Sequence, residues 1–302
     1  MRNRTCSRAC GWICTHALVV AVLSSVAVSQ TQDLDVLFNA SNDAGVGVFR
    51  VEADDWDWSD ATQSFTWQLS SPQLIADETS GAPVATILSA RVAIFEGIER
   101  RMEINLGIVA GDSATVVDID FPQLAFDRIP EYRAEARASA SFTVTDVDLN
   151  GAFIRGDGPE GIGAFRATSV DRGVETPFTD LVNFVFVGGG GTANGSQNDP
   201  SFGFRPVGSN LDAMNVQLAF LVTANDLVFA TNSVGVSNPP VCPGDANGDN
   251  QTNLSDLELL LSSFGSCAGD SIYDQRADLN VDDCVGFDDL AEMLSAFGTV
   301  CD

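Results

Sequence analysis

Apolar and polar residues alternate with a period of two over much of the chain between residues 30 and 231. Such alternation places one side of a strand in a core and leaves the other side in water. The clearest runs are 65–69, 102–108, 138–144, 181–187 and 216–220, separated by turn-rich stretches such as 157–163 and 188–198. Many short strands with little helical spacing predict a mainly β domain over residues 30–231, an antiparallel β-sandwich or jelly roll.

The pattern changes after residues 232–241, which contain Pro239 and Pro240 and are predicted to form a linker. Residues 242–302 instead carry two apolar stripes with helical spacing. The stripes are Leu254, Leu257, Leu260, Leu261 and Phe264, and then Phe287, Leu290, Met293, Leu294 and Phe297. Glycines at Gly265 and Gly298 are suited to ending the two helices. A small α-helical domain is therefore predicted to follow the β domain.

The first 29 residues have the features of a cleaved signal peptide. Arg2, Arg4 and Arg8 precede an apolar run over residues 17–28, and small residues flank a cleavage site near residue 29. The alternative is a membrane anchor, but this run is shorter than the roughly 20 residues that a spanning helix needs. We therefore expect a secreted protein, extracellular or at the cell surface, with no membrane insertion after signal cleavage.

Composition narrows the possible chemistry. The 42 acidic residues outnumber 15 basic ones, giving a formal charge of −27, and every basic residue is arginine. The one histidine, His16, lies in the predicted signal. Without lysine or another histidine, Schiff-base chemistry, a P-loop and a histidine-based triad are excluded. So acidic a chain also repels nucleic acid. We expect no catalytic site, unless two carboxylates form a glycosidase pair.

Two segments of twelve residues, starting at Asp245 and Asp278, repeat 33 residues apart and have acidic or amide side chains at positions 1, 3, 5 and 12. This is the spacing of a calcium loop, in which position 7 adds a main-chain carbonyl. The predicted ligands are Asp245, Asn247, Asp249, Gln251 and Asp256, and Asp278, Asn280, Asp282, Cys284 and Asp289, with Gln251 and Cys284 binding through the carbonyl. The sequence predicts two calcium ions.

Two positions depart from the usual loop. Position 6, where the backbone bends sharply, holds Asn250 and Asp283 in place of glycine, and both residue types tolerate positive φ. Position 9 of the second loop is Gly286, which offers no side-chain ligand, so water is expected there. The alternative to calcium binding is a pair of Asx-rich turns that cap the helices without an ion.

Neither loop is preceded by a predicted helix, which separates the pair from ordinary EF-hands. The loop–helix duplication resembles a type I dockerin, in the cysteine-bearing form of secreted bacterial proteins. That resemblance implies docking to a cohesin-like or other cell-surface protein. Loop positions 10 and 11 commonly hold a Ser-Thr recognition pair in that family. The candidate partner-contact residues at these positions are Leu254, Ser255, Phe287 and Asp288.

The four cysteines beyond the signal, Cys242, Cys267, Cys284 and Cys301, all lie in this module. An even number in an exported module predicts two disulfides; a zinc site is disfavoured because no C-x-x-C spacing exists. Sequential pairing would span a helix roughly 16 Å long. The antiparallel packing that the duplicated stripe and the dockerin resemblance suggest favours Cys242–Cys301 and Cys267–Cys284, although connectivity does not follow strictly from sequence.

Weaker signals lie in the β domain. Residues 146–157 also match the calcium-loop pattern, with Asp146, Asp148 and Asp157 at positions 1, 3 and 12, but Asn150-Gly151 favours a plain hairpin. The other weak signals are a possible sugar-stacking group (Trp56, Trp58 and Trp67), an acidic cluster (Asp54, Asp55, Asp57 and Asp60) and a glycine run at 188–191. Core packing, a solvated surface and a flexible loop are the expected explanations.

Taken together, the patterns predict an exported, non-catalytic β-sandwich that a calcium-loaded C-terminal module attaches to another protein. The alternatives are a polysaccharide-binding or polysaccharide-degrading cargo protein of an extracellular complex, and a structural surface protein. The sequence sets neither the ligand of the β domain nor the oligomeric state.

Overall fold

The computed structural model describes residues 34–97, 99–131, 133–157, 163–237 and 242–301. The predicted signal peptide, residues 1–29, lies outside the described residues, as do residues 238–241 of the predicted linker and most of the turn-rich stretch 157–163. No helix within the described residues is both long and apolar enough to cross a membrane.

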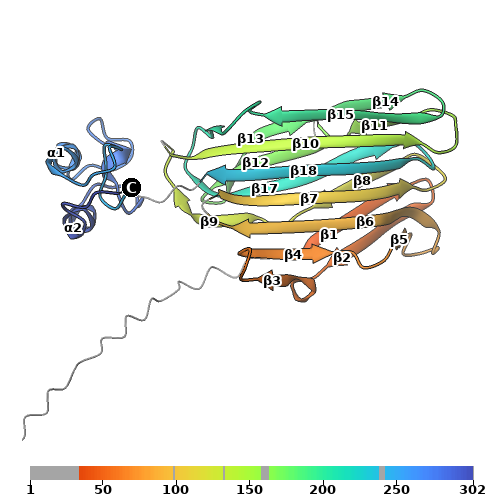
Figure 1. Cartoon of the computed structure of the whole chain (residues 1–302), viewed down its shortest axis with the longest axis horizontal. Coiled ribbons are helices and arrows are strands. Elements are labelled where there is room, and N and C mark those ends of the chain that lie inside the picture. Colours follow the sequence, from red (N-terminus) through yellow and green to blue (C-terminus); the bar gives the residue numbers. More distant parts are fainter. Residues whose placement is uncertain (1–33, 98, 132, 158–162, 238–241, 302) are drawn as a thin grey trace, which may run out of the picture. The chain divides into compact units, whose positions relative to one another are not determined.

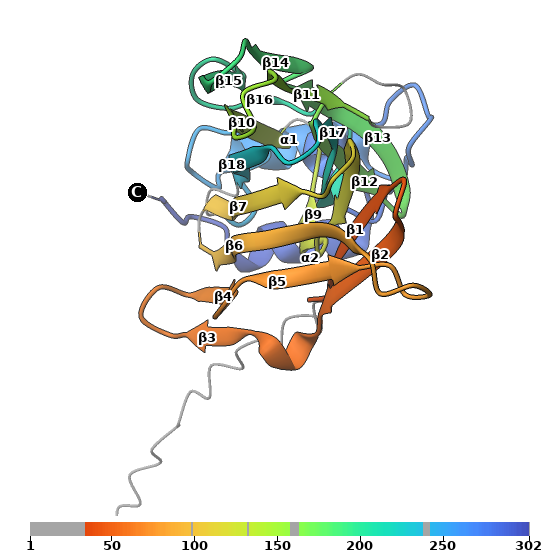
Figure 2. The same cartoon turned by 90° about the vertical axis from the view of Figure 1, so that its right-hand side faces the viewer.

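Residues 34–237 form two antiparallel sheets of nine strands each, which lie face to face (Figures 1 and 2). The first sheet contains β1 (Val36–Asn42), β2 (Gly45–Val51), β8 (Thr115–Asp120), β9 (Leu124–Ile129), β11 (Ala152–Gly156), β12 (Phe165–Asp171), β13 (Val174–Leu181), β14 (Phe184–Val187) and β17 (Leu211–Val222). The second contains β3 (Asp57–Ser59), β4 (Ser64–Gln68), β5 (Gln73–Ala76), β6 (Pro83–Glu96), β7 (Glu99–Ala110), β10 (Glu135–Asp146), β15 (Gly191–Asp199), β16 (Arg205–Pro206) and β18 (Leu227–Ser237). A single-turn helix, η1 (Ala53–Asp55), precedes β3. The predicted mainly β, sandwich-like fold is confirmed.

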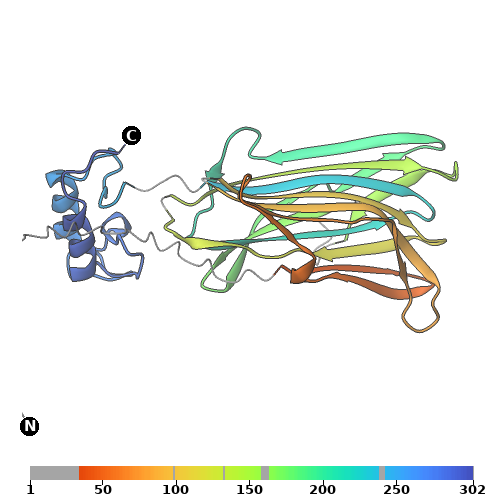
Figure 3. The same cartoon turned by 60° about the horizontal axis from the view of Figure 1, so that its bottom comes forward.

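Strand order follows a simple path in each sheet. The first sheet runs β13-β12-β17-β8-β1-β2, with β9 and β11 also paired to β17 and β14 paired to β11. The second runs β15-β10-β18-β7-β6-β4-β3, with β16 beside β10 and β5 beside β6. In Figure 3 the long strands of both sheets run in nearly the same direction. Strands far apart in sequence are therefore direct neighbours, as β10 and β18 are.

The core lies between the sheets and follows the predicted alternation. In β7 the inward residues Met102, Ile104 and Ile108 are almost fully buried. Phe142 of β10 and Phe220 of β17 meet edge to face across the two sheets, with ring centroids 5.6 Å apart. One continuous set of buried side chains joins the sheets. Burial of this apolar surface is the main driving force for folding of the domain.

The prediction of a turn-rich segment at 188–198 is wrong for most of its length, because β15 occupies Gly191–Asp199 and pairs with β10. β15 lies at the end of its sheet and has almost no apolar side chains, so no alternation marks it. Its Gly195 packs directly under Val185, where a Cβ atom would come 2.5 Å from the valine methyl. Main-chain pairing and close packing, rather than side-chain pattern, specify this strand.

Two further boundaries differ from expectation. The run 181–187 is divided between β13 and β14 by Val182, which has a positive φ of 59°. Residues 232–237, expected in the linker, complete β18 and pair with both β7 and β10. Val234 and Val236 are buried there, so the period-two alternation of the domain extends six residues beyond the predicted boundary.

The predicted Asn150-Gly151 hairpin is also wrong. β10 ends at Asp146 and β11 begins at Ala152, but the two strands belong to different sheets and do not pair. The intervening segment crosses from one sheet to the other. It is organised by the Asp146 carboxylate, which accepts hydrogen bonds from main-chain N–H groups of Leu149 and Gly151. A side chain therefore replaces the main-chain ladder that a hairpin would require.

Residues 242–301 contain two short helices, α1 (Leu254–Ser263) and α2 (Phe287–Ser295), and a single-turn helix, η2 (Gln275–Ala277). Gly265 and Gly298 have φ of 82° and 86° just beyond the two helices, as the sequence predicts. The apolar core of this module is a cluster of five buried residues: Ala246, Leu260, Ala277, Val285 and Met293. Each predicted stripe thus contributes only one fully buried residue, Leu260 or Met293.

Candidate functional site

The first loop of the C-terminal module is folded around Asp245. Its Oδ1 accepts hydrogen bonds from the N–H groups of Gly248 (2.7 Å) and Asp249 (3.1 Å), and its Oδ2 accepts one from Asn250 (2.7 Å). These bonds wrap the main chain around one carboxylate. Gly248 and Asn250, at positions 4 and 6, have φ of 80° and 63°. The tight bend at position 6 is therefore present with asparagine in place of glycine.

Asp256 closes the first loop from the start of α1. It is fully buried, and it accepts hydrogen bonds from the N–H groups of Asn247 (3.0 Å) and Asn253 (2.8 Å). Carboxylate oxygens of Asp245, Asp249 and Asp256 lie within 4.8 Å of one another. Such a set of convergent oxygens is suited to a hard cation such as calcium. Three residues that the sequence places at positions 1, 5 and 12 are thus brought together.

The second loop repeats this geometry with one difference. Asp278 accepts from the N–H groups of Asp282 and Asp283, and buried Asp289 accepts from Leu279 (2.8 Å) and Gly286 (2.7 Å). Val281 and Asp283 have φ of 58° and 74°, matching positions 4 and 6 of the first loop. Among the residues described, however, the carboxylates at positions 1, 5 and 12 do not gather within the same limit.

Hydrogen bonds to neighbouring side chains hold two of the predicted ligands of the second loop in place. Tyr273 donates its O–H to Asp278 Oδ2 (2.8 Å), and Asn280 donates its side-chain N–H to Asp282 Oδ2 (3.1 Å). Burial, together with the nearby Asp289 carboxylate, raises the pKa of Asp278. Burial and the hydrogen bond to Asp278 raise the pKa of Tyr273. A positive ion in this loop would relieve the cost of burying these carboxylates.

The two repeats pair reciprocally through their position-8 residues. Thr252 bonds with Gly298 and Thr299 beyond α2, and Val285 bonds with Gly265 and Ser266 beyond α1. The predicted position-7 residues, Gln251 and Cys284, form isolated bridges to Val300 and Cys267 in this arrangement. Each loop therefore depends on the other repeat for its support.

Disulfides join Cys242 to Cys301 and Cys267 to Cys284. This is the crossed pairing that the sequence and the dockerin resemblance favour. Each bond ties one repeat to the other, so the disulfides reinforce the reciprocal main-chain pairing.

The module also exposes large apolar side chains. Leu254 and Phe287, at position 10 of the two loops, are 70% and 78% exposed on the first turns of α1 and α2. Phe264 meets Phe287 edge to face, with centroids 5.2 Å apart. Further exposed apolar residues on or after the helices are Leu261, Leu294, Phe297 and Val300. Much of each predicted apolar stripe therefore lies on the surface.

The weaker candidates of the β domain do not form a shared site. Trp56 and Trp67 are buried in the core, whereas Trp58 is 43% exposed and donates to Asp60 (2.7 Å). Asp55 accepts a hydrogen bond from the main-chain N–H of Glu52 (3.0 Å), as a local cap. These partners account for Trp58, Asp60 and Asp55 without a ligand.

An aromatic surface that the sequence did not suggest is formed by β11 and β14. Phe184 and Phe186 are 57% and 58% exposed, and their rings lie nearly parallel at 6.5 Å, with Phe153 5.8 Å from Phe184. Val185 between them is buried. The Phe-Val-Phe alternation was the available signal, because period-two spacing places both phenylalanines on the face opposite the valine.

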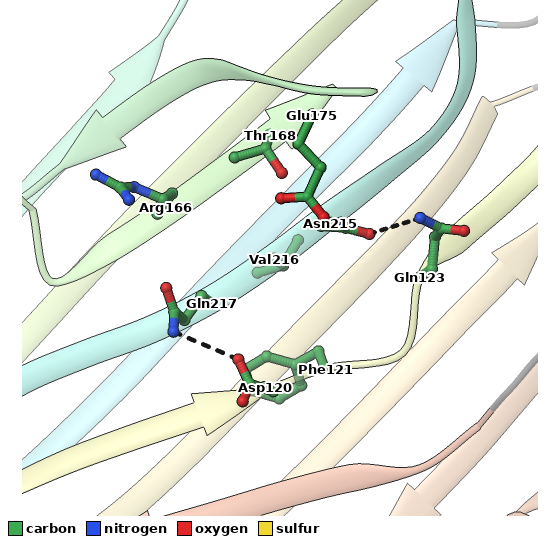
Figure 4. A pocket seen from close by; sticks show the side chains of 9 residues that line it. All are labelled: Asp120, Phe121, Gln123, Arg166, Thr168, Glu175, Asn215, Val216 and Gln217. Atoms are coloured by element: carbon green, nitrogen blue, oxygen red, sulfur yellow. Dashed lines mark hydrogen bonds between the residues drawn. The ribbon is translucent and has the colours of Figure 1, made fainter. Parts of the chain in front are cut away.

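A hollow of about 410 Å³ lies on the first sheet (Figure 4). It is lined mainly by polar residues of β8, β12, β13 and β17 and of the segment after β8: Asp120, Phe121, Gln123, Arg166, Thr168, Glu175, Asn215, Val216 and Gln217. Gln217 donates to Asp118 (2.9 Å), Asn215 to Glu175 (2.7 Å) and Gln123 to Asn215 (2.9 Å). Burial, and then the Asp120 charge, raise the pKa of Asp118.

No protein-family profile and no curated protein matches this chain. Among solved structures, it is similar to the glycoside hydrolase domain of Endo-D from Streptococcus pneumoniae R6, with a TM-score of 0.17 and 11% identity. That alignment covers 62% of this chain but spans only 23% of the other. So low a TM-score carries no argument about fold or activity.

Proposed function

We propose that residues 242–301 are a calcium-binding docking module that attaches an exported, non-catalytic β-sandwich to a cohesin-like protein. The two loops would each hold one calcium ion, and the helices that follow them would contact the partner. The proposal includes secretion, which the two disulfides support because such bonds persist mainly outside the cytosol.

The observation that carries the proposal is the equivalent exposure of Leu254 and Phe287. Large apolar side chains at the same position of both repeats, each within an acidic loop–helix unit, favour a contact surface. Exposed apolar patches of this kind are typical of protein interaction sites. Calcium is linked to this surface because Asp256 and Asp289 belong to the first turns of the same helices.

The test uses the full chain and a panel of recombinant cohesin domains as probes. We expect binding in calcium that is lost in chelator, and a loss of at least tenfold in affinity when Leu254→Ser and Phe287→Ser are combined. The matched control replaces two exposed valines of the β domain, Val46→Ser and Val174→Ser, and should bind as the wild type does. Binding that is indifferent to both chelator and the double variant would contradict the proposal.

A second candidate function, binding of polysaccharide by the β domain, is favoured by the aromatic surface of Phe153, Phe184 and Phe186. Exposed parallel rings on a sheet can stack on the apolar faces of sugar rings. The double variant Phe184→Ala and Phe186→Ala should lose retardation in affinity electrophoresis through soluble polysaccharides. If none of the polysaccharides tested slows the migration of the wild type or of the variant, this function is rejected.

A further inference from the structure

Three carboxylates meet in the β domain at the ends of two neighbouring strands. Asp146 ends β10, Asp148 follows it, and Asp226 directly precedes β18. The antiparallel register pairs Thr145 with Leu227, so continuing it by one residue sets Asp146 opposite Asp226. One carboxylate oxygen from each of the three residues lies within 4.8 Å of the other two.

Asp226 is the unusual member of this group. Its side chain is fully buried, and Oδ1 accepts a hydrogen bond from the N–H of Val147 (3.1 Å). Its Oδ2 is also buried and has no hydrogen-bond partner. An ionised carboxylate oxygen left unpaired beside two other acids is costly. The arrangement becomes favourable when a cation occupies the space between the three groups.

The segment after β10 has the same local fold as the first half of the two C-terminal loops. Asp146 accepts from the N–H groups three and five residues ahead, Leu149 (2.9 Å) and Gly151 (3.0 Å), as Asp245 does in its loop. Leu149 and Gly151, at positions 4 and 6, have φ of 71° and 96°. The path that encloses an ion in a calcium loop is therefore present in the β domain.

The acid that takes the role of loop position 12 comes from a distant part of the sequence, the residue directly before β18. In the second C-terminal loop, Asp289 at position 12 accepts from the N–H of position 2, Leu279. Asp226 accepts from the N–H of position 2 here, Val147. The residue at position 12 of the contiguous pattern, Asp157, lies beyond β11, where Arg155 contacts it at 3.6 Å. Asp226 thus takes the place that Asp157 was expected to fill.

We propose that Asp146, Asp148 and Asp226 form a calcium site in the β domain, independent of the C-terminal docking module. The ligands would be oxygen atoms, which suit a hard divalent cation, and residues 34–237 contain no histidine or cysteine for a softer metal. Asp146 Oδ1 accepts one hydrogen bond and keeps capacity for an ion. Asp148 is exposed, so the ion enters from solvent, and water completes its shell.

The test measures bound calcium per full-length chain by equilibrium dialysis and elemental analysis. Wild type should bind one more calcium than Asp226→Asn or Asp148→Asn. Asp157→Asn is the matched control and should bind as many as the wild type. Because each comparison is a difference between variants of the same chain, it is unaffected by how many ions the C-terminal loops hold.

Asp148→Asn keeps the proposal testable if Asp226→Asn does not fold, because Asp148 is exposed. Circular dichroism of each variant verifies folding. Equal calcium content in wild type and a folded Asp148→Asn variant would overturn the proposal. Loss of an ion in Asp157→Asn would overturn it as well, because the site would then follow the contiguous loop.

Discussion

The β-sandwich and the C-terminal module are stabilised by very different means. The sandwich joins two nine-stranded sheets through a continuous apolar core and contains no cysteine. The module has a core cluster of five buried apolar residues, together with two disulfides and two carboxylate loops. A small domain buries a smaller fraction of its surface and needs additional constraints. The comparison teaches that in the module the acids proposed to hold ions also have a structural role, because their carboxylates accept the hydrogen bonds that shape the loops.

The largest expected difference follows removal of these constraints. Chelator together with reductant should expose residues 242–301 to proteolysis while leaving 34–237 resistant. Loss of a native disulfide from a small exported domain costs about 2–5 kcal/mol, which is comparable to the total stability expected of such a module. Limited proteolysis followed by mass spectrometry of the fragments measures this. Equal resistance of both regions would show that the module's apolar core is sufficient.

A matched pair of core substitutions tests the same contrast at the level of one side chain. Met102 of β7 and Met293 of α2 are both fully buried. Replacing either with alanine should cost about 2–5 kcal/mol. We expect Met293→Ala to unfold the module in chelator, whereas Met102→Ala leaves the sandwich folded. Hydrogen exchange of the full chain reports both regions separately, and loss of protection in the sandwich but not in the module would refute the contrast.

The smallest effect concerns the edge of the sandwich. The Arg205 side chain bonds both oxygens of Asp199 at 2.8 Å and lowers the pKa of that carboxyl. The stability from this pair is present above the ordinary Asp pKa and is lost as the pH falls through the lower folded value. Because the pair is partly exposed, Asp199→Asn should cost less than about 1 kcal/mol at neutral pH.

Denaturant titrations at several pH values measure the Asp199→Asn effect. The difference between wild type and variant should vanish in strong acid. A difference that persists there would place the effect in packing rather than in charge.

How far the sequence predicted the molecule depends on how local each signal is. The alternation in β7 and β10 and the two loops with their helices are visible in short windows, and the structure has these elements there. β15 was missed because its pairing uses the main chain and leaves no side-chain pattern. Leu254 and Phe287, predicted as partner-contact residues, are exposed, but the exposure of much of the rest of each stripe was not predicted, because helical spacing identifies a face but not what covers it.

No short stretch of the sequence indicates that Asp226 belongs to this group of acids. It lies 80 residues from Asp146, and only the pairing of β10 with β18 brings the two together. The contiguous pattern instead pointed to Asp157, which satisfies the spacing but lies beyond another strand. Sequence patterns for calcium loops assume that one continuous loop supplies all the ligands of the ion. They fail where residues distant in sequence contribute to the same site.

The alignment of β10 with β18 has a consequence for folding fidelity. A slip of one residue between these strands would turn the inward valines of β18, such as Val234 and Val236, toward the opposite face. The same slip would carry Asp226 away from the N–H of Val147. Two features therefore favour the native register of these strands. Burial of the inward valines acts along their length, and the hydrogen bond from the Val147 N–H to Asp226 forms at their end only in that register.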